Sequence, residues 1–345
     1  MRWFDENARD LPWRHSRDPY AIWVSEIMLQ QTRVAAVLEH YTRFMSRFPT
    51  LHDLATATED EVLAHWSGLG YYRRARMLHR AAQFVWENLG GKLPEKSSEL
   101  RMLPGVGEYT AAAVASIGFG EPIVCVDGNV ERVLRRLRGW DENSGTVAKV
   151  KKGAARLMDA SRPGDFNQAM MELGATVCVP RGPKCAQCPV SELCLTQGEH
   201  RVTERKKMRS VESAYAFLRR TPRGRTMAAE VLLEQRQADA SLMPGMWELP
   251  AIDAVAAQVE SRAFAVRHSI TDTNYYVTIY RLDARHEKRL PQTDAARRWH
   301  SVRELQKLPL TGLARKVLKR LKAWPGYDGA GLPVVIEESR RSAME

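Results

Sequence analysis

The central motif of this 345-residue sequence reads Leu103-Pro104-Gly105-Val106-Gly107-Glu108-Tyr109-Thr110. Its two glycines allow a sharp turn and a close approach of the backbone to a ligand. Helices are expected on both sides, at Ser98–Met102 and from Tyr109 onward, and the free N–H groups that start the second helix can hold a phosphate. A bare Gly-x-Gly is often an ordinary turn. Between two helices it predicts a helix-hairpin-helix, which grips a DNA backbone regardless of base sequence.

Helical periodicity extends outward from this motif, from Arg17 to about Leu195. Asp18 and Pro19 suit the N-cap and first position of a helix that is expected to reach Gln31. Turn signals rich in Gly and Pro separate the further expected helices. These lie near Val34–Phe48, Glu59–Ser67, Arg73–Leu89, Tyr109–Phe119, Val130–Arg138, Ala148–Ala160 and Phe166–Cys178. We therefore expect residues 1–200 to form an all-α domain.

The pattern changes after about residue 200. Residues 201–212, with Glu204-Arg205-Lys206-Lys207, are expected to be a charged linker. Beyond it a period of two predicts strands, followed by a closing helix. The strands are expected at Ser213–Arg219, Met227–Glu234, Arg262–Val266 and Tyr275–Tyr280, and the helix near Leu313–Ala323. The sequence thus predicts a multidomain protein with a smaller α+β domain at 213–325 and a loose tail at 326–345.

Composition favours a polyanionic partner. Lys and Arg outnumber Asp and Glu by 52 to 41, for a formal charge of +11, and the apolar share of 44% is ample for packed cores. Each phosphate that a basic surface neutralises releases a counterion, although the same excess also fits a merely solvated surface. The first residues contain no apolar core of a signal peptide, and no run approaches the ~18 apolar residues of a membrane span. No membrane partner is expected.

Four of the five cysteines fall within seventeen residues: Cys178, Cys185, Cys188 and Cys194, spaced C-x6-C-x2-C-x5-C. Zinc sites usually pair two close knuckles, and this stretch has one, so a [4Fe–4S] cluster fits better than zinc or unligated thiols. Such a cluster would shape the loop at 179–184, which carries two cations; redox sensing is the alternative role. Cys125 is expected to be a small core residue. This usage favours a reducing, intracellular setting.

Two carboxylates have contrasting surroundings. Glu26 lies inside an apolar helix, with Trp23, Gln30 and Arg33 expected on the same face. Partial burial beside a Trp favours the neutral form and suits a general acid. Asp127 precedes a helix whose dipole keeps an anion ionised. By analogy with sugar–sugar bonds, this pairing fits glycosidic cleavage through an oxocarbenium-like state. The simpler alternatives are a plain N-cap for Asp127 and a solvated helix residue for Glu26.

Together these segments resemble the adenine DNA glycosylases of the MutY family, within the helix-hairpin-helix, Gly/Pro-Asp superfamily. The resemblance rests on five motifs and covers nearly all of residues 1–200 in order. They are Trp23-Val24-Ser25-Glu26-Ile27-Met28-Leu29-Gln30-Gln31-Thr32, Gly68-Leu69-Gly70-Tyr71-Tyr72, Leu103–Thr110, Val126–Asn129 and the four cysteines. More loosely, 213–325 resembles the family's Nudix-like recognition domain through Leu242-Met243-Pro244-Gly245-Met246-Trp247-Glu248-Leu249-Pro250.

The resemblance implies catalytic roles. Glu26 would protonate adenine at N7, and Asp127 would stabilise the sugar cation before water attacks. Tyr109 and Asn129 resemble residues that order this site. Gly105 and Gly107 belong to the motif that binds the DNA backbone.

The resemblance also implies contacts to bases. Gln31 and Leu69 would fill the stack when adenine leaves it, and Gln168 would contact the flipped base. Thr32 and Tyr71 would meet the opposite 8-oxoguanine. For Leu69 and Tyr71, core packing is the alternative.

One family feature is altered. The family's Phe-Ser-His triplet, which contacts 8-oxoguanine, is replaced here by Ile270-Thr271-Asp272. Thr271 keeps a hydroxyl, and Asp272 brings an acceptor in place of an imidazole. His268 and Ser269 could instead supply the contacts in a shifted loop.

The resemblance implies a monofunctional glycosylase of base excision repair. It would act as a monomer, in the cytoplasm at the nucleoid, on double-stranded DNA with adenine opposite 8-oxoguanine or guanine, and would carry a [4Fe–4S] cluster. An endonuclease III-like glycosylase/lyase for oxidised pyrimidines is the alternative, but such relatives place a Lys where Tyr109 stands. A non-catalytic DNA-binding protein would leave Glu26 and Asp127 unexplained. A Nudix hydrolase would need a metal-binding box that the second domain lacks.

Overall fold

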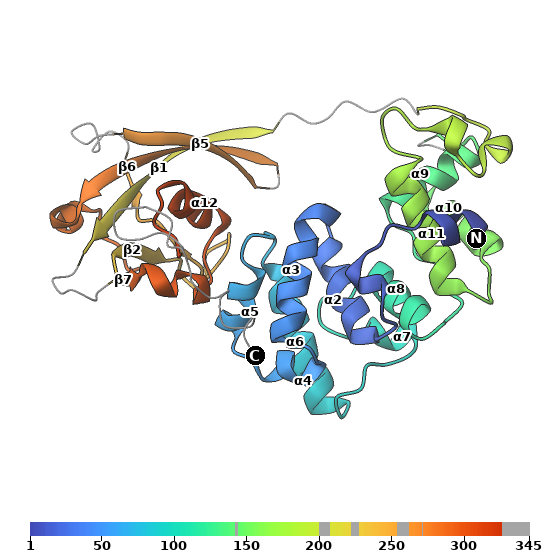
Figure 1. Cartoon of the computed structure of the whole chain (residues 1–345), viewed down its shortest axis with the longest axis horizontal. Helices are drawn as coiled ribbons and strands as arrows, with labels where there is room; N and C mark the ends of the chain where they lie inside the picture. The colour runs from blue at the N-terminus through green and yellow to red at the C-terminus, as the bar shows by residue number, and fades with distance from the viewer. Residues whose placement is uncertain (142–143, 200–207, 222–227, 254–261, 271, 326–345) are drawn as a thin grey trace, which may run out of the picture. The chain divides into compact units, whose positions relative to one another are not determined.

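The computed structural model describes residues 1–141, 144–199, 208–221, 228–253, 262–270 and 272–325 (Figure 1). The chain forms two compact units. The first contains Met1–Ala57 and Arg74–Glu204, and the second contains Thr58–Arg73 and Arg205–Glu345. Thr58–Arg73 therefore groups with the second unit, although it lies within the expected helical region. Within the described residues, no helix is long and apolar enough to cross a membrane.

The first unit is helical, as the sequence predicts. Its elements are α1 (Arg2–Asn7), η1 (Pro12–Arg14), α2 (Pro19–Leu29), α3 (Val34–Arg47), α4 (Leu51–Thr56), α6 (Arg73–Asn88), α7 (Ser97–Leu100), α8 (Glu108–Gly118), α9 (Gly128–Leu137), α10 (Val147–Leu157), α11 (Pro163–Thr176), η2 (Cys185–Gln187) and η3 (Ser191–Leu193). The short helices α1 and α4 are additional to the expected ones.

Helix α2 ends two residues earlier than the sequence predicts. Asp18 caps it by accepting the N–H of Tyr20, as expected. At the other end, Gln30 leaves the helical region with ψ 115° and Gln31 has φ +54°. Arg33 is consequently the N-cap of α3 and does not lie on the face of Glu26. The prediction for Arg33 was wrong because the backbone turns before the next helical repeat.

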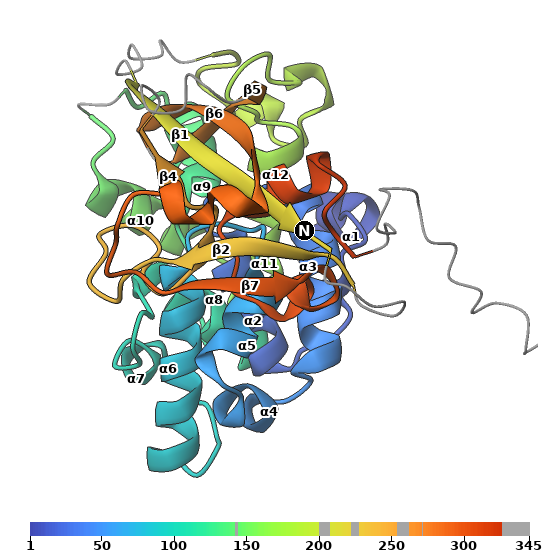
Figure 2. The ribbon, with the colours of Figure 1, turned by 90° about the vertical axis from the view of Figure 1, so that its left-hand side faces the viewer.

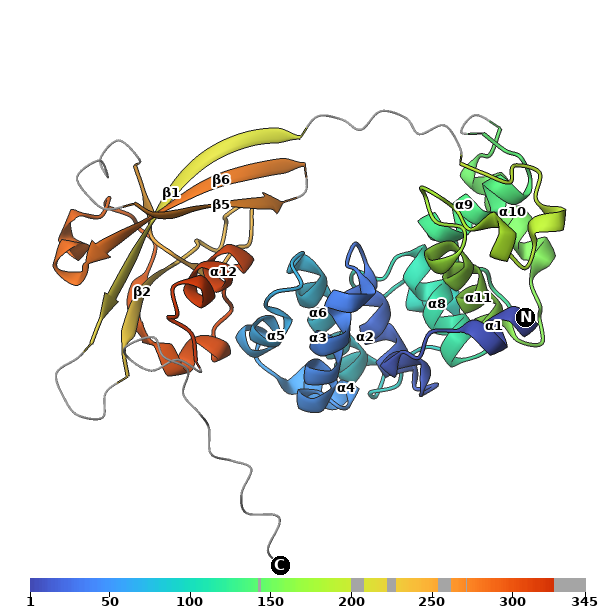
Figure 3. The ribbon, with the colours of Figure 1, turned by 45° about the horizontal axis from the view of Figure 1, so that its top comes forward.

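Close packing around α2 builds the core of this unit. Every α2 residue from Tyr20 to Met28 is buried, so neighbours approach it from all sides. The adjacent α8 presents small residues, and Ala111–Ala115 are all buried. A Cβ added to Gly118 would lie 3.1–3.2 Å from Pro19. Figure 3 shows α2, α8 and α11 next to one another.

The expected hairpin lies between α7 and α8. Leu103 and Val106 are buried and close the turn through a Val106 N–H to Leu103 carbonyl bond of 3.1 Å. Gly105 has φ +74°, and Gly107 is the N-cap of α8 without a side-chain cap. The first amides of α8 are therefore available to an external anion.

The second unit combines a mixed sheet with a closing helix (Figure 2). The strands are β1 (Arg209–Arg220), β2 (Glu230–Gln235), β3 (Trp247–Glu248), β4 (Ala251–Ile252), β5 (Arg262–Ile270), β6 (Thr273–Asp283) and β7 (Arg297–Ser301). Their order is β3-β2-β1-β6-β5, with β4 on β1 and β7 on β2. The long central pair β1 and β6 is parallel, and β5 and β6 form an antiparallel hairpin.

The other elements of the second unit are α5 (Glu59–Trp66), η5 (Ala284–Arg289), η6 (Val302–Lys307) and α12 (Gly312–Arg320). Val317 and Leu318 of α12 share one hydrophobic core with Phe217 and Ile279 of the sheet. The hydroxyls of Ser67 and Tyr72, in the turn after α5, each donate to the Leu310 carbonyl at 3.0 Å. The expected strands and closing helix are thus present. The expected linker at 201–212 is too long, because β1 begins at Arg209 and pairs with β6 from its first residue.

We predict that Gly105→Ala lowers the melting temperature, with a loss of more than about 1 kcal/mol. A Cβ at residue 105 would lie 2.4 Å from the Cβ of Met77, at a φ that L residues rarely adopt. The matched control is Gly107→Ala, where φ is −85° and nothing lies within 4 Å of the added atom. Thermal melts that rank both variants equally would contradict this account of the turn.

Candidate active site

Most of the predicted site residues of the first unit face one cavity of about 740 Å³. It is bounded by α2, the hairpin, the start of α9, α11 and the segment before α2. The predicted residues that line it are Glu26, Gln31, Thr32, Gly105, Gly107, Tyr109, Asp127, Asn129 and Gln168. Folding therefore brings together residues that are spread over more than a hundred positions of the sequence.

Glu26 is the buried acid of this cavity, with 7% of its surface exposed. Burial raises its pKa to about 7, the nearby charge of Asp127 adds to the rise, and the hydroxyl of Tyr109 opposes it by donating to Oε2 at 2.9 Å. Burial raises the pKa of Tyr109 well above its usual value, so this hydroxyl remains a donor. A carboxyl with a pKa near neutrality can release its proton to a substrate.

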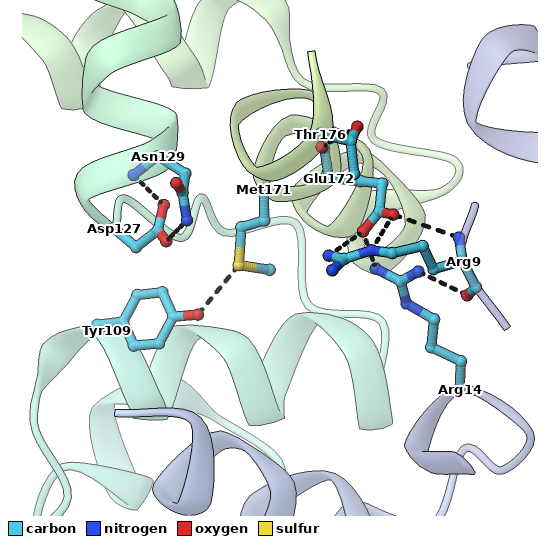
Figure 4. A network of polar contacts seen from close by, with 8 residues as sticks. All are labelled: Arg9, Arg14, Tyr109, Asp127, Asn129, Met171, Glu172 and Thr176. Atoms are coloured by element: carbon cyan, nitrogen blue, oxygen red, sulfur yellow. Dashed lines mark hydrogen bonds and ion pairs between the residues drawn. The ribbon is translucent and has the colours of Figure 1, made fainter. Parts of the chain in front are cut away.

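Asp127 is the fixed anion of the cavity (Figure 4). It caps α9, and its Oδ1 accepts the backbone N–H groups of Asn129 at 2.9 Å and Val130 at 2.8 Å. The side-chain amide of Asn129 donates to Oδ2 at 2.7 Å. These donors and the positive end of the helix dipole are complementary to a carboxylate. The N-cap, considered above as an alternative role, is therefore the arrangement that holds the charge.

Arg132 extends this arrangement, and the sequence analysis missed it. Its Nη2 donates to the Asn129 side-chain oxygen at 2.8 Å and to the Gly174 carbonyl at 2.7 Å, and its Nε donates to the Cys178 carbonyl at 2.8 Å. One guanidinium thus ties the start of α9 to the end of α11 and to the first cysteine. The sequence feature that could have indicated this contact is the position of Arg132 one helical turn after Asn129.

A further carboxylate at the cavity, that of Glu172, was also missed. Glu172 is 1% exposed and binds two arginines, Arg9 through Nε at 2.6 Å and Arg14 through Nη2 at 2.8 Å (Figure 4). Burial would raise the pKa of Glu172, but the two guanidinium groups outweigh burial and lower it. The partners lie some 160 positions apart, so no local pattern indicates the cluster.

The remaining predicted base contacts lie in the second unit. Leu69 is buried and Tyr71 is 43% exposed with φ +50°, both in the turn after α5. Asp272 is exposed in the turn immediately before β6, where its Oδ1 accepts a hydrogen bond from the Thr273 hydroxyl at 3.1 Å. Thr271 lies outside the described residues. None of these residues lines the cavity of the first unit.

The four cysteines line a second, small cavity together with Arg136. Donors are directed at two of the sulfurs: Arg136 Nη1 lies 3.5 Å from Cys178 Sγ, and the Gln197 N–H lies 3.5 Å from Cys194 Sγ. Such donors suit thiolates that carry negative charge. In the described part of the chain, no group of three or more His, Cys, Asp or Glu is arranged to hold a single metal ion.

Comparison with known proteins agrees with this geometry. Residues 24–160 match the HhH-GPD superfamily of base excision DNA repair proteins. Human adenine DNA glycosylase is 53% identical over 206 residues, 56% of this chain and 38% of that protein. Arabidopsis thaliana adenine DNA glycosylase is 40% identical over 296 residues, 73% of this chain and 46% of that protein.

Among solved structures, a thermostable thymine-DNA glycosylase superposes with a TM-score of 0.54 and 33% identity. The match covers 57% of this chain and 92% of that one. The fold of the first unit is that of a helix-hairpin-helix DNA glycosylase, and the chain belongs to the HhH-GPD superfamily of base excision DNA repair proteins. Within it, the chain is similar to adenine DNA glycosylases and spans less than half the length of the two named above.

We predict that Glu26→Gln stabilises the protein increasingly as pH rises from 5 to 8. The folded pKa of about 7 lies above the ordinary value of 4.5, so the wild-type carboxyl favours folding below 4.5 and loses that contribution as pH rises to about 7. The gain should approach the order of 3 kcal/mol at pH 8. Denaturant unfolding at both pH values measures it. Equal gains at pH 5 and pH 8 would contradict the raised pKa.

Proposed function

We propose that the protein is a monofunctional adenine DNA glycosylase that hydrolyses the N-glycosidic bond of adenine paired with 8-oxoguanine or guanine. The observation that carries the proposal is the pairing of Glu26, a buried acid with a pKa near neutrality, and Asp127, a fixed anion, on one cavity. A base cannot be reached inside a duplex, so adenine must flip into this cavity. The similarity to adenine DNA glycosylases supports this choice of base.

The chemistry follows from these two groups. Glu26 donates its proton to N7 of adenine and makes the base a better leaving group. Tyr109 keeps the carboxyl in place through its 2.9 Å hydrogen bond. As the bond to the base breaks, the sugar gains positive charge, and the carboxylate of Asp127 stabilises it until water adds to the anomeric carbon. Asn129 holds that carboxylate, and Gln168 contacts the flipped base.

Further residues are proposed to bind the duplex. The Gly105–Gly107 turn and the first amides of α8 bind a phosphate. Gln31, exposed where the chain leaves α2, and Leu69 fill the place of the flipped base. Leu69 must leave its buried position to do so. Thr32 and Tyr71 contact the opposite base.

A lyase reaction is not part of the proposal. A Schiff base on the sugar needs an amine next to the anomeric carbon. At the corresponding place of the cavity the chain has Tyr109, whose hydroxyl is engaged with Glu26. The endonuclease III-like alternative therefore lacks its nucleophile here.

We predict that the full-length chain releases adenine from a duplex with one A opposite 8-oxoguanine and leaves an abasic strand that breaks in hot alkali. Glu26→Gln and Asp127→Asn should each lower the single-turnover rate by at least the ~10²–10⁴-fold typical of acid–base catalysis, because each removes one half of the charge pair. Both should still bind the mispaired duplex in a gel-shift assay.

Strand breakage without alkali, or a covalent adduct trapped by borohydride in high yield, would favour the lyase. A rate near that of the wild type in either variant would remove that residue from catalysis.

The second unit is proposed to be a Nudix-like domain that recognises the base opposite adenine. Adenine carries no lesion, so the mispair must be recognised through its partner. The candidate reader is the turn between β5 and β6, where Thr271 and Asp272 stand in place of the family's Phe-Ser-His triplet. Asp272 can accept a hydrogen bond from the N7–H that distinguishes 8-oxoguanine from guanine.

We predict that Asp272→Ala lowers the preference for 8-oxoguanine over guanine by roughly 1–3 kcal/mol, the range of one base contact. Thr271→Ala should act in the same direction. The measurement is the ratio of single-turnover rates on the two mispairs. Asp239→Ala is a control that removes an exposed carboxylate from another loop. An unchanged ratio in both test variants would shift recognition to His268 and Ser269 or to another element.

The cysteine loop is proposed to hold a [4Fe–4S] cluster through Cys178, Cys185, Cys188 and Cys194. The donor set fits, because four thiols line one cavity and hydrogen-bond donors are directed at two of the sulfurs. When bound, the cluster supplies a structural cross-link that shapes the loop at 179–184 for DNA. No catalytic step requires it.

We predict about four iron atoms per chain and a brown colour in protein purified without oxidation. Cys188→Ser should lose iron and weaken DNA binding, and the loss relative to the wild type should be smaller at raised salt, because the phosphate contacts of Arg181 and Lys184 contribute less there. Metal analysis and binding titrations at two salt concentrations provide the test. Stoichiometric zinc in place of iron would overturn the assignment.

A further inference from the structure

The segment that precedes Asp127 is partly buried and belongs to no helix or sheet. Residues 121–127 run without regular secondary structure, and Cys125 in their middle is 1% exposed. Buried backbone polar groups need partners, and this stretch has no ladder to provide them. The position of the Asp127 carboxylate therefore depends on what else binds this segment.

Asn167 of α11 supplies those partners. Its side chain is 1% exposed, and its Oδ1 accepts the Cys125 N–H at 3.0 Å. Its Nδ2 donates to the Ile123 carbonyl at 2.8 Å and to the Ser116 hydroxyl at 2.9 Å. Since one contact is to an N–H and another to a carbonyl, the amide has a single orientation that satisfies both.

Asn167 belongs to a stripe of α11 that packs against the site. The stripe consists of Gly164, Asn167, Met171 and Gly174, which share one helix face. A Cβ on Gly164 would lie 2.7 Å from Ile117 Cα, and one on Gly174 would lie 2.6 Å from Asn129 Cβ. Backbone contacts on both sides of Asn167 thus hold the helix against α8 and α9. Because α11 is held on both sides, Asn167 keeps its position and does not move with residues 121–127.

We propose that Asn167 is a positioning residue that holds the Ile123–Cys125 backbone and so sets the place of the Asp127 carboxylate. It contacts neither base nor sugar and acts through the chain that leads to Asp127. This inference rests on the proposed function, which assigns Asp127 to the sugar cation. A misplacement of about 1 Å at a reacting centre can cost on the order of 10²-fold in rate.

A displacement of the Asp127 carboxylate would also change the pKa of Glu26. The groups that act on Glu26 are Tyr109, Asp127 and Arg14, and Cys125 lies close by. The charge of Asp127 helps to raise the pKa of Glu26, so a carboxylate that moves away lowers that pKa. The rate, which depends on protonated Glu26, would then begin to fall at a lower pH than in the wild type.

The test compares Asn167→Leu with a matched control, His79→Leu, in the full-length chain. Leu has a similar size to Asn but makes no hydrogen bonds. His79 is likewise buried and bonds a backbone carbonyl, that of Ala57 at 3.0 Å, but it does not line the cavity. The readouts are the single-turnover excision rate from pH 5 to 9, binding of a duplex with an uncleavable 2′-fluoro adenosine, and hydrogen exchange of residues 121–127.

Asn167→Leu is expected to lower the excision rate about 10²-fold, to shift the alkaline limb of the profile to lower pH and to speed exchange in residues 121–127. Binding should change only a few-fold, and His79→Leu should keep the wild-type profile. A rate loss no larger than that of the control, or an unshifted limb with unchanged exchange, overturns the inference. If the leucine variant does not fold, Asn167→Asp, which keeps the acceptor for Cys125, must show the same changes in smaller degree. A wild-type chain that does not release adenine would instead overturn the proposed function.

Discussion

The burial of one carboxyl, that of Glu26, is the constraint on which the rest of the first unit depends. An ionisable group in a helix without a solvent-facing side needs a hydrogen-bond donor and neighbours that fit closely. Tyr109 supplies the donor from α8, and the alanines after it allow α8 to approach α2. The motif that forms the hairpin therefore also places the hydroxyl beside the acid. The hairpin turn and the hydrogen-bond donor to Glu26 thus lie in one short stretch of sequence.

The carboxylate of Asp127, in contrast to that of Glu26, is surrounded by several hydrogen-bond donors. Asp127 gains donors from a helix end, a side-chain amide and, one step further, the guanidinium of Arg132. Glu172 is stabilised in the same way by two arginines. In a site of low polarity, the number of donors around each carboxylate decides whether it is charged. One cavity thereby holds Glu26, whose pKa is raised, and Glu172, whose pKa is lowered.

Much of this could be predicted from local patterns. The helix positions, the hairpin, the burial of Glu26 and the N-cap position of Asp127 follow from caps, glycines and periodicity, which act over a few residues. The end of α2 was misjudged because the backbone turn at Gln30 and Gln31 carries no proline or glycine signal. Arg9, Arg14 and Glu172 were missed because their pairing joins distant segments. Asn167 was missed because an Asn inside a helix is usually a surface residue, and its role depends on a segment that α11 meets in space.

The grouping of Thr58–Arg73 with the sheet has a consequence for how the molecule is made. The chain enters the second unit, leaves it and returns to it later, so no single cut separates the two units. On the ribosome, Ser67 emerges 243 residues before the Leu310 carbonyl that it binds. During synthesis, Thr58–Arg73 is made before the sheet against which it packs, whereas the helices that follow it in the sequence are made earlier than the sheet. Gene fusion of an intact sheet domain to an existing helical enzyme would not by itself recreate this arrangement, since part of the sheet's packing is encoded within the other half.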